Sequence, residues 1–376
     1  MLKMLTSLHL NNFKAFTSRT IRLGRLTLLS GLNGTGKSSI LQSLAMLRQS
    51  SDSGFLNDGA WLLNGELVEL GRGADVLCEH GTDSIAIGVT EAKKRAEPLA
   101  EETWSVEYNA TSNVLRPQAN QPLMHPSREL NLFQPGFQYL RADRVNPAVT
   151  FPKSHYAVHG RRFLGSRGEY TSHFLLDHRD EDIPCEGLIH PDEPEARGLL
   201  SQVNSWIQVF SPGVRVSVQD VPMTDLVRLE FQYRSQGFGY GNPFRATNVG
   251  YGLTYSLPIV VAALASQPGS LVLIENPEAH LHPLGQLAIG DLLARAAAAR
   301  VQIIIETHSD HVLNGIRLAV KRERLPASDA VLHFFERNAA GDVEIQSPTV
   351  DQHGLLSEWP PGFFTQWDDT LLELLS

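Results

Sequence analysis

The sequence predicts an α/β fold in which helices flank a central, mostly parallel sheet and an inserted lobe interrupts the chain. Two observations carry this prediction. Near the N-terminus a buried strand, a glycine-rich loop and a helix follow one another, and from Gly250 onward strands alternate with helices. With 376 residues, the chain can form one large domain with an inserted lobe or two modest domains.

The N-terminal elements are predicted from the spacing of apolar residues. Residues 5–16 alternate as in a strand, and residues 26–30 read as a second, buried strand. A helix is expected from Ser38 to about Gln49. Between Ser50 and Leu200 the signals are mixed, so this part is expected to form the inserted lobe.

The last third of the chain has a regular pattern that completes the parallel sheet together with the first third. The expected elements are a helix at 257–265, a strand at 270–275, a helix at 285–299, a strand at 301–307, a helix at 310–322, and a hairpin of 331–337 with 343–346.

The loop from Gly31 to Ser38 fills every fixed position of the pattern G-x-x-x-x-G-K-[ST]. Its glycines let backbone N–H groups point at phosphate oxygens, and the following helix adds the positive end of its dipole. Lys37 is expected to reach the β- and γ-phosphates of ATP, and Ser38 to offer its hydroxyl to Mg²⁺. The predicted nucleotide-binding residues are Asn33, Gly34, Thr35, Gly36, Lys37, Ser38 and Ser39.

A second nucleotide motif begins with residues 271–275, an apolar run that ends in Glu275. A buried strand of this kind delivers a Mg²⁺-binding carboxylate at its C-terminal end. Three segments, NGTGKSS, LIENPEAHLHP and ETHSDH, together resemble the ATPase domain of the soluble ABC group that includes RecF, Rad50-like and OLD-family proteins. The closest resemblance is to stand-alone bacterial AAA-family ATPases of the OLD-like type.

The resemblance implies a P-loop NTPase of the ABC-ATPase type, with Glu275 at the Walker B position and His308 as the histidine that senses the γ-phosphate. Asn248 to Gly252 lie where the family places its signature loop, although the usual serine is replaced. In relatives this loop contacts the ATP held by the opposite subunit. Gly250 and Gly252 are therefore expected to bind nucleotide, and a head-to-tail homodimer is implied.

The resemblance also suggests a division of the chain. Residues 1–50 and 246–350 are expected to form the ATPase core, residues 51–245 the remaining ATPase-associated strands and the inserted lobe, and residues 351–376 a C-terminal motif and helix. The motif, residues 360–368, resembles the ending of the stand-alone group and has no assigned role.

One departure from the family concerns hydrolysis. Most ABC ATPases have a glutamate after the Walker B carboxylate, whereas this chain has Asn276, which orients a water but cannot accept its proton. Either Glu278 takes over, or hydrolysis is slow. General-base help is worth about 10²–10⁴-fold, so weak turnover is expected, with Asn276, Glu278 and His308 as the catalytic residues.

Two further assignments have alternatives. Gln49, at the end of the first helix, is either the glutamine that bridges Mg²⁺ and the attacking water in the superfamily that the chain resembles, and so a metal-site residue with Ser38 and Glu275, or an ordinary helix-end residue. Four histidines also have spacings compatible with zinc, which would suggest a metal-dependent nuclease or phosphoesterase instead. The nucleotide interpretation is preferred because they lie in segments where the family binds ATP or contacts its partner subunit. They are His280, His282, His308 and His311.

Composition limits the remaining classes. The net charge of −9 argues against a surface that binds DNA throughout, although a local basic patch remains open. Arg141, Asp143 and Arg144 are expected to form a surface ion-pair cluster. No run of about 18 apolar residues and no secretory signal layout occur, so a cytoplasmic protein is expected.

The sequence thus favours a homodimeric ATPase that acts as a nucleotide-gated switch on a partner protein or nucleic acid, in anti-phage defence or DNA maintenance. The alternative from another class is a non-hydrolysing ATP sensor or scaffold that assembles with a separate effector nuclease or toxin. An ABC transporter subunit is the weakest interpretation, because the full signature loop is absent.

Overall fold

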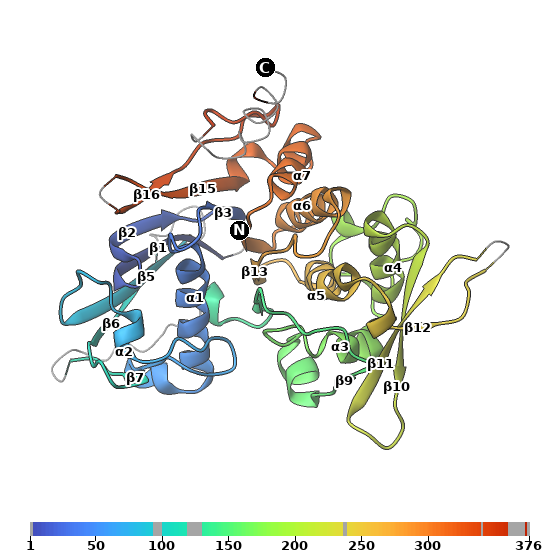
Figure 1. Ribbon diagram of the computed structural model, residues 1–376, viewed down its shortest axis with the longest axis horizontal. Helices are drawn as coiled ribbons and strands as arrows, with labels where there is room; N and C mark the ends of the chain where they lie inside the picture. The colour runs from blue at the N-terminus through green and yellow to red at the C-terminus, as the bar shows by residue number, and fades with distance from the viewer. Residues whose placement is uncertain are drawn as a thin grey trace.

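The computed structural model describes residues 3–92, 100–118, 130–235, 239–339 and 341–359, together with residue 373. A six-stranded sheet lies at the centre of the molecule (Figure 1). Its strands, in spatial order, are β16 (Val343–Gln346), β15 (Ala330–Arg337), β3 (Leu26–Gly31), β14 (Gln302–Glu306), β13 (Leu271–Glu275) and β8 (Gln138–Leu140). All neighbours are parallel except the hairpin of β15 and β16. The predicted α/β fold is confirmed.

Both faces of this sheet are buried, which explains the apolar runs in its strands. In β13, Val272 and Ile274 belong to one hydrophobic core, whereas Leu271 and Leu273 belong to the other. Successive side chains of a strand point to opposite faces, so each strand contributes to two layers. The covering helices are α1 (Lys37–Asp52) on one face, and α5 (Tyr251–Ala265), α6 (Pro283–Ala298) and α7 (Asp310–Lys321) on the other.

A second, antiparallel sheet lies beyond α1. It comprises β2 (Phe16–Arg22), β1 (Met4–Phe13), β5 (Ser84–Ala92) and β6 (Ala100–Glu107). The prediction of one continuous strand over residues 5–16 was wrong, because the chain turns at Lys14, which has φ 49°, and β2 begins at Phe16. A short pair, β4 (Trp61–Leu62) with β7 (Val114–Leu115), and the single turn α2 (Gly73–Val76) complete this side.

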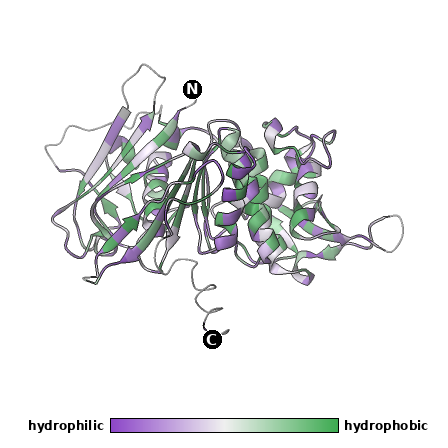
Figure 2. Ribbon diagram, turned by 90° about the horizontal axis from the view of Figure 1, so that it is seen from above, coloured by the Kyte–Doolittle hydropathy of each residue, from purple (hydrophilic) through white to green (hydrophobic). Residues whose placement is uncertain are grey.

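A lobe occupies the opposite end of the molecule in both views (Figures 1 and 2). Its antiparallel sheet contains β10 (Val214–Asp220), β11 (Leu226–Tyr233) and β12 (Phe244–Arg245), and β9 (Thr150–Pro152) also pairs with β11. Helices α3 (Thr171–His178) and α4 (Leu199–Phe210) pack on the inner face of this sheet. The proposed division of the chain remains a prediction.

Two further observations concern single segments. None of the helices in the described part of the chain combines the length and the apolar character needed to cross a bilayer. The predicted C-terminal motif at residues 360–368 lies outside the described residues.

Candidate nucleotide-binding site

The phosphate loop joins β3 to α1, as the sequence predicts. Gly31, Gly34 and Gly36 adopt φ of 132°, 72° and 91°, in the range that favours glycine. A Cβ atom on Gly31 would lie 2.0 Å from the carbonyl oxygen of Phe335, and one on Gly36 would lie 2.8 Å from the Cβ of Ala15. The loop therefore requires glycine at both positions, for its conformation and for its packing.

Lys37 begins α1, and its side chain turns back into the loop. Its Nζ donates hydrogen bonds to the carbonyl oxygens of Gly31, at 3.0 Å, and Leu32, at 2.6 Å. Burial lowers the pKa of Lys37, while the nearby charge of Glu306 opposes this shift. A cavity of about 280 Å³ lies at the loop and is lined by Lys14, Ala15, Asn33, Gly34, Gly36, Lys37, Ser38, Ser39 and Glu306. The lysine ammonium thus lines a cavity bounded by the phosphate loop.

Two carboxylates end adjacent strands beside this loop. Glu275 and Glu306 are paired in the parallel register of β13 and β14. The Ser38 hydroxyl donates to Glu306 Oε1 at 2.9 Å, while Glu306 Oε2 is buried and has no hydrogen-bond partner among the described residues. Burial and the neighbouring Glu275 raise the pKa of Glu306 to about 7. A buried carboxylate oxygen without a donor, next to a serine hydroxyl, fits the oxygen ligands that Mg²⁺ prefers.

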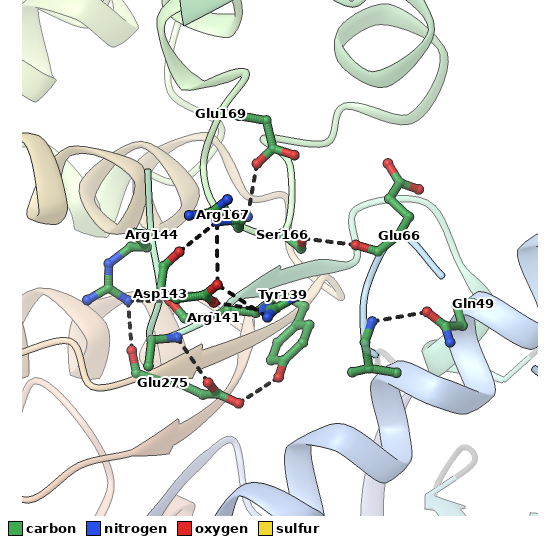
Figure 3. Close-up of polar contacts among 12 residues, drawn as sticks. Gln49, Glu66, Tyr139, Arg141, Asp143, Arg144, Ser166, Arg167, Glu169 and Glu275 are labelled. Carbon is green, nitrogen blue, oxygen red and sulfur yellow. Dashed lines mark hydrogen bonds and ion pairs between the residues drawn. The ribbon is translucent and has the colours of Figure 1, made fainter. Parts of the chain in front are cut away.

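Glu275 itself is held by the protein (Figure 3). Its Oε1 accepts a hydrogen bond from the Tyr139 hydroxyl at 2.6 Å, and its Oε2 accepts one from the backbone N–H of Ala142 at 2.9 Å. Burial and the charge of Glu275 raise the pKa of Tyr139 well above its ordinary value, so the phenol keeps its proton. Both oxygens of the predicted Walker B carboxylate therefore have fixed partners.

Arg144 braces the turn after β13 (Figure 3). Its guanidinium donates to the carbonyl oxygens of Arg141, Glu275 and Asn276 at 2.9, 2.7 and 2.7 Å. The side chain is 1% exposed, and burial lowers its pKa to about 10. The expected surface cluster is thus corrected: Arg141 and Asp143 form an exposed ion pair at 2.8 Å, whereas Arg144 is buried in the site.

Asn276 follows Glu275 in a left-handed conformation, with φ 43°. Asparagine tolerates this region better than most residues with a side chain. Its backbone N–H donates to the carbonyl oxygen of Glu306 at 2.8 Å, and its buried Oδ1 has no hydrogen-bond partner among the described residues. The amide oxygen therefore has hydrogen-bonding capacity that the described residues leave unused.

Glu278 and His308 are brought together. Glu278 Oε1 accepts a hydrogen bond from the His308 backbone N–H at 2.8 Å, and its Oε2 accepts one from the Thr307 hydroxyl at 2.7 Å. Burial and the nearby Lys37 lower the pKa of the exposed His308, which favours the neutral imidazole. These contacts suit Glu278 to positioning the His308 segment.

Gly250 and Gly252 lie at the start of α5. A Cβ on Gly250 would have no atom within 4 Å, whereas a Cβ on Gly252 would lie 2.5 Å from the carbonyl oxygen of His280. The His280 ring lies 5.5 Å from that of Tyr251 and 4.8 Å from that of Tyr255. Gly252 therefore allows the signature segment to pack on the loop after β13, and Gly250 faces open space.

Gln49 lies on the last turn of α1, and both ends of its amide bond to backbone. Its Nε2 donates to the carbonyl oxygen of Leu62 at 2.7 Å, and its Oε1 accepts from the N–H groups of Leu67 and Val68 at 3.2 and 3.0 Å. The assignment of Gln49 as a Mg²⁺ ligand gains no support from these contacts.

The zinc alternative also gains no support. In the described chain, His280, His282, His308 and His311 form no group with metal-ligand spacing, and such a group occurs instead at His159, His173 and Asp177. There, His173 Nδ1 accepts a hydrogen bond from the backbone N–H of Ser154 at 3.1 Å, so the neutral ring carries its proton on Nε2, toward Asp177. That nitrogen is not free to bind a metal ion.

Three parts of the chain match known protein families. Residues 4–111 match the family described as "AAA ATPase domain", and residues 149–314 match "AAA domain, putative AbiEii toxin, Type IV TA system". Residues 325–374 match a "Protein of unknown function (DUF3696)". No curated protein sequence matches the chain.

Solved structures of Smc heads have a fold similar to that of this chain. An Smc head bound to the C-terminal domain of ScpA, derived from Pyrococcus furiosus, is 12% identical, with a TM-score of 0.55 and 100% of each chain covered. An Smc head bound to the C-winged helix domain of ScpA is 14% identical, with a TM-score of 0.53, and the match covers 92% of this chain and 98% of that one. Two family models of AAA ATPase domains thus match separate parts of the chain, and its fold is similar to that of Smc heads. The resemblance stated from the motifs is confirmed.

Several residues of the site were missing from the predictions made from the sequence. Glu306 carries the same signal as Glu275, a carboxylate that ends an apolar strand, and could have been found by it. Three others carry no local signal, since only the fold brings them to the site: Tyr139, Arg144 and Arg337. The Arg337 guanidinium donates to the Gly34 carbonyl oxygen at 2.8 Å.

Proposed function

We propose that this protein binds Mg·ATP at the phosphate loop, hydrolyses it slowly and acts as a nucleotide-gated homodimeric switch in defence against phage or in DNA maintenance. One observation carries the proposal: α1 places Lys37 and Ser38 against the strand ends that hold Glu275 and Glu306. The lysine ammonium, the serine hydroxyl and the two carboxylates thus lie in the arrangement that a triphosphate and its metal ion require. The proposal places the protein in the cytoplasm, where ATP is available.

Mg²⁺ would be held by the Ser38 hydroxyl and Glu306, whose Oε2 has no other partner in the described chain, with the charge of Glu275 beside them. The bound ion would neutralise charge on the phosphates. Glu275 would act mainly through its negative charge beside the ion, since both of its oxygens already accept hydrogen bonds.

The nucleoside would occupy a second cavity of about 540 Å³, which shares Lys14 and Ala15 with the cavity at the phosphate loop. Arg337 also lines it and reaches the loop through its hydrogen bond to Gly34. A ligand that fills both cavities would therefore place its phosphates at Lys37 and its base between the β1–β2 turn and the hairpin of β15 and β16.

Slow hydrolysis follows because no candidate general base among the described residues is left without another role. Asn276 cannot accept a proton, Glu278 is engaged with the His308 segment, and Glu306 faces Ser38. Asn276 Oδ1 would orient the attacking water, and His308 would contact the γ-phosphate. Binding energy from the phosphates would then serve mainly to hold one conformation of the dimer.

The dimer would place the open surface at Gly250 against ATP on the opposite subunit. Exposed Tyr251 and Leu284, which are 52% and 69% exposed, would lie in the same contact. The ScpA-bound Smc heads support a separate partner protein for this chain, and such a partner would accelerate turnover.

Phosphate release in the steady state tests the proposal. We expect wild-type turnover well below the roughly 10 s⁻¹ median of enzymes, and an increase on the order of 10²-fold in Asn276→Glu, because a carboxylate at this position accepts the proton of the attacking water. Asn276→Gln is the control, since it carries the same backbone strain without a carboxylate. Turnover of tens per second in the wild type would contradict the proposal.

The alternative, a non-hydrolysing sensor or scaffold, is favoured by the engaged carboxylate of Glu278. It predicts ATP-dependent dimerisation with no phosphate release from the wild type, in the presence or absence of a partner. The same assay therefore separates the two functions.

A further inference from the structure

The outer face of the lobe sheet carries a cluster of arginines. Val216, Leu229 and Phe231 point inward and are buried against α3 and α4. Residues paired directly across strands share a face, so Arg215 lies on the outer face with Gln232, and Arg228 with Gln219. The arginines of this outer face are Arg215, Arg228, Arg234 and Arg245, and all four are exposed.

Most of this cluster lacks compensating charge. Among the described residues, Arg215, Arg234 and Arg245 form no ion pair, and the contact of Arg228 with Glu230 is long, at 3.8 Å. Glu230 is the carboxylate that shares this face, and it is 8% exposed. A local excess of arginine in a chain of net charge −9 indicates an anionic partner at this face.

The groups between the arginines are polar rather than apolar. Ser217, Gln219, Gln232 and Thr150 lie on the same face, and their hydroxyl and amide groups can bond to base edges. The Tyr240 ring lies 5.4 Å from the Arg215 guanidinium. Arg228 and Arg234 lie six positions apart along extended chain, a span of about 20 Å.

We propose that this face binds single-stranded nucleic acid. Arginines along the sheet would contact successive phosphates, while Tyr240, the guanidinium planes and the glutamine amides would contact unstacked bases. An open sheet face presents these groups side by side, which suits splayed bases better than bases stacked inside a duplex.

The position of the face connects it with the nucleotide site, and this step rests on the proposed function. Arg245 ends β12, and the turn η5 (Ala246–Asn248) leads directly to the signature segment at Gly250. A nucleic-acid strand bound at Arg245 would therefore act on the segment at Gly250, which would contact ATP across the dimer.

Fluorescence anisotropy with the full chain tests the proposal. The probes are labelled oligo(U) and oligo(dT) of about 20 nucleotides and a duplex of equal length, each measured over a range of salt concentrations. We expect both single strands to bind more tightly than the duplex. The triple variant Arg215→Gln, Arg234→Gln, Arg245→Gln should bind roughly tenfold or more weakly, with a salt slope shallower by about 2, since each phosphate contact contributes about 0.7.

The matched control removes three exposed arginines from other surfaces: Arg116→Gln, Arg179→Gln and Arg322→Gln. With no nucleotide in the assay, it should bind like the wild type. Under the same conditions Lys37→Ala should also bind the probes like the wild type, which keeps a failure of ATP binding distinct from a failure of this proposal. Equal loss in both triple variants, preference for the duplex, or displacement by polyglutamate as effective as by oligo(U) would overturn it.

Discussion

Glu306 is a buried carboxylate whose ionisation affects the site. It is 6% exposed, ends β14 beside Glu275 and Lys37, and has a pKa of about 7 in the folded protein against 4.5 ordinarily. Because the folded-state pKa is raised, ionisation of Glu306 opposes folding. The cost is absent below about pH 4.5, grows as the pH rises, and is complete above about pH 7.

Glu306→Gln should remove this cost. Without Mg²⁺, we expect the variant and the wild type to have similar free energies of unfolding near pH 4.5, and the variant to be more stable by about 3 kcal/mol near pH 8. Urea denaturation at several pH values measures the difference. Exposed Glu101→Gln is the control, and a stability difference that did not change with pH would contradict the assignment.

At this scale, the sequence predicts residues that belong to a contiguous motif. The phosphate loop and Glu275 could be found because glycine spacing and a carboxylate after an apolar strand are local signals. The hydrogen-bond partners of Asn276 and Glu278 could not be predicted, because Glu306 and Thr307 lie about 30 residues further along the chain, at the end of another strand. Only the pairing of β13 with β14 brings them into contact.

Among the elements, β8 and the turn after it fix the end of β13. The edge strand β8 has three residues, too few to show a periodic pattern, so its place in the central sheet could not be predicted. By contrast, β3, α1, β13, β14 and α7 were predicted to within a few residues, since long apolar runs and a helix N-terminus are strong local signals.

Arg144→Lys tests the bracing of this turn. A lysine has one ammonium group and cannot replace a planar guanidinium that donates to three carbonyl oxygens, so we expect a loss of about 2–4 kcal/mol in the free energy of unfolding, measured in urea. The neighbouring Arg141→Lys is the matched control. Its exposed ion pair with Asp143 should be worth about 1 kcal/mol or less, and equal losses in both variants would refute the distinction.

For the whole molecule, the central prediction is a dimer that closes on ATP. Gly250 has φ −60° and open space around it, so a side chain there should not disturb the fold. Gly250→Trp should block dimerisation in Mg·ATP, whereas Gly187→Trp, at an equally open glycine near the lobe, should not. Light scattering after size exclusion should give twice the chain mass of 41.5 kDa for the wild type and the control. A Gly250→Trp variant that dimerised normally would exclude this face from the interface.

Calorimetric titration of the chain with Mg·ATP tests the central claim most directly. The account predicts one ATP per chain for the wild type and for Lys321→Ala, an exposed lysine on α7, and no measurable binding for Lys37→Ala. A wild-type protein that gave no heat of binding, or a Lys37→Ala variant that bound Mg·ATP as tightly as the wild type, would contradict it.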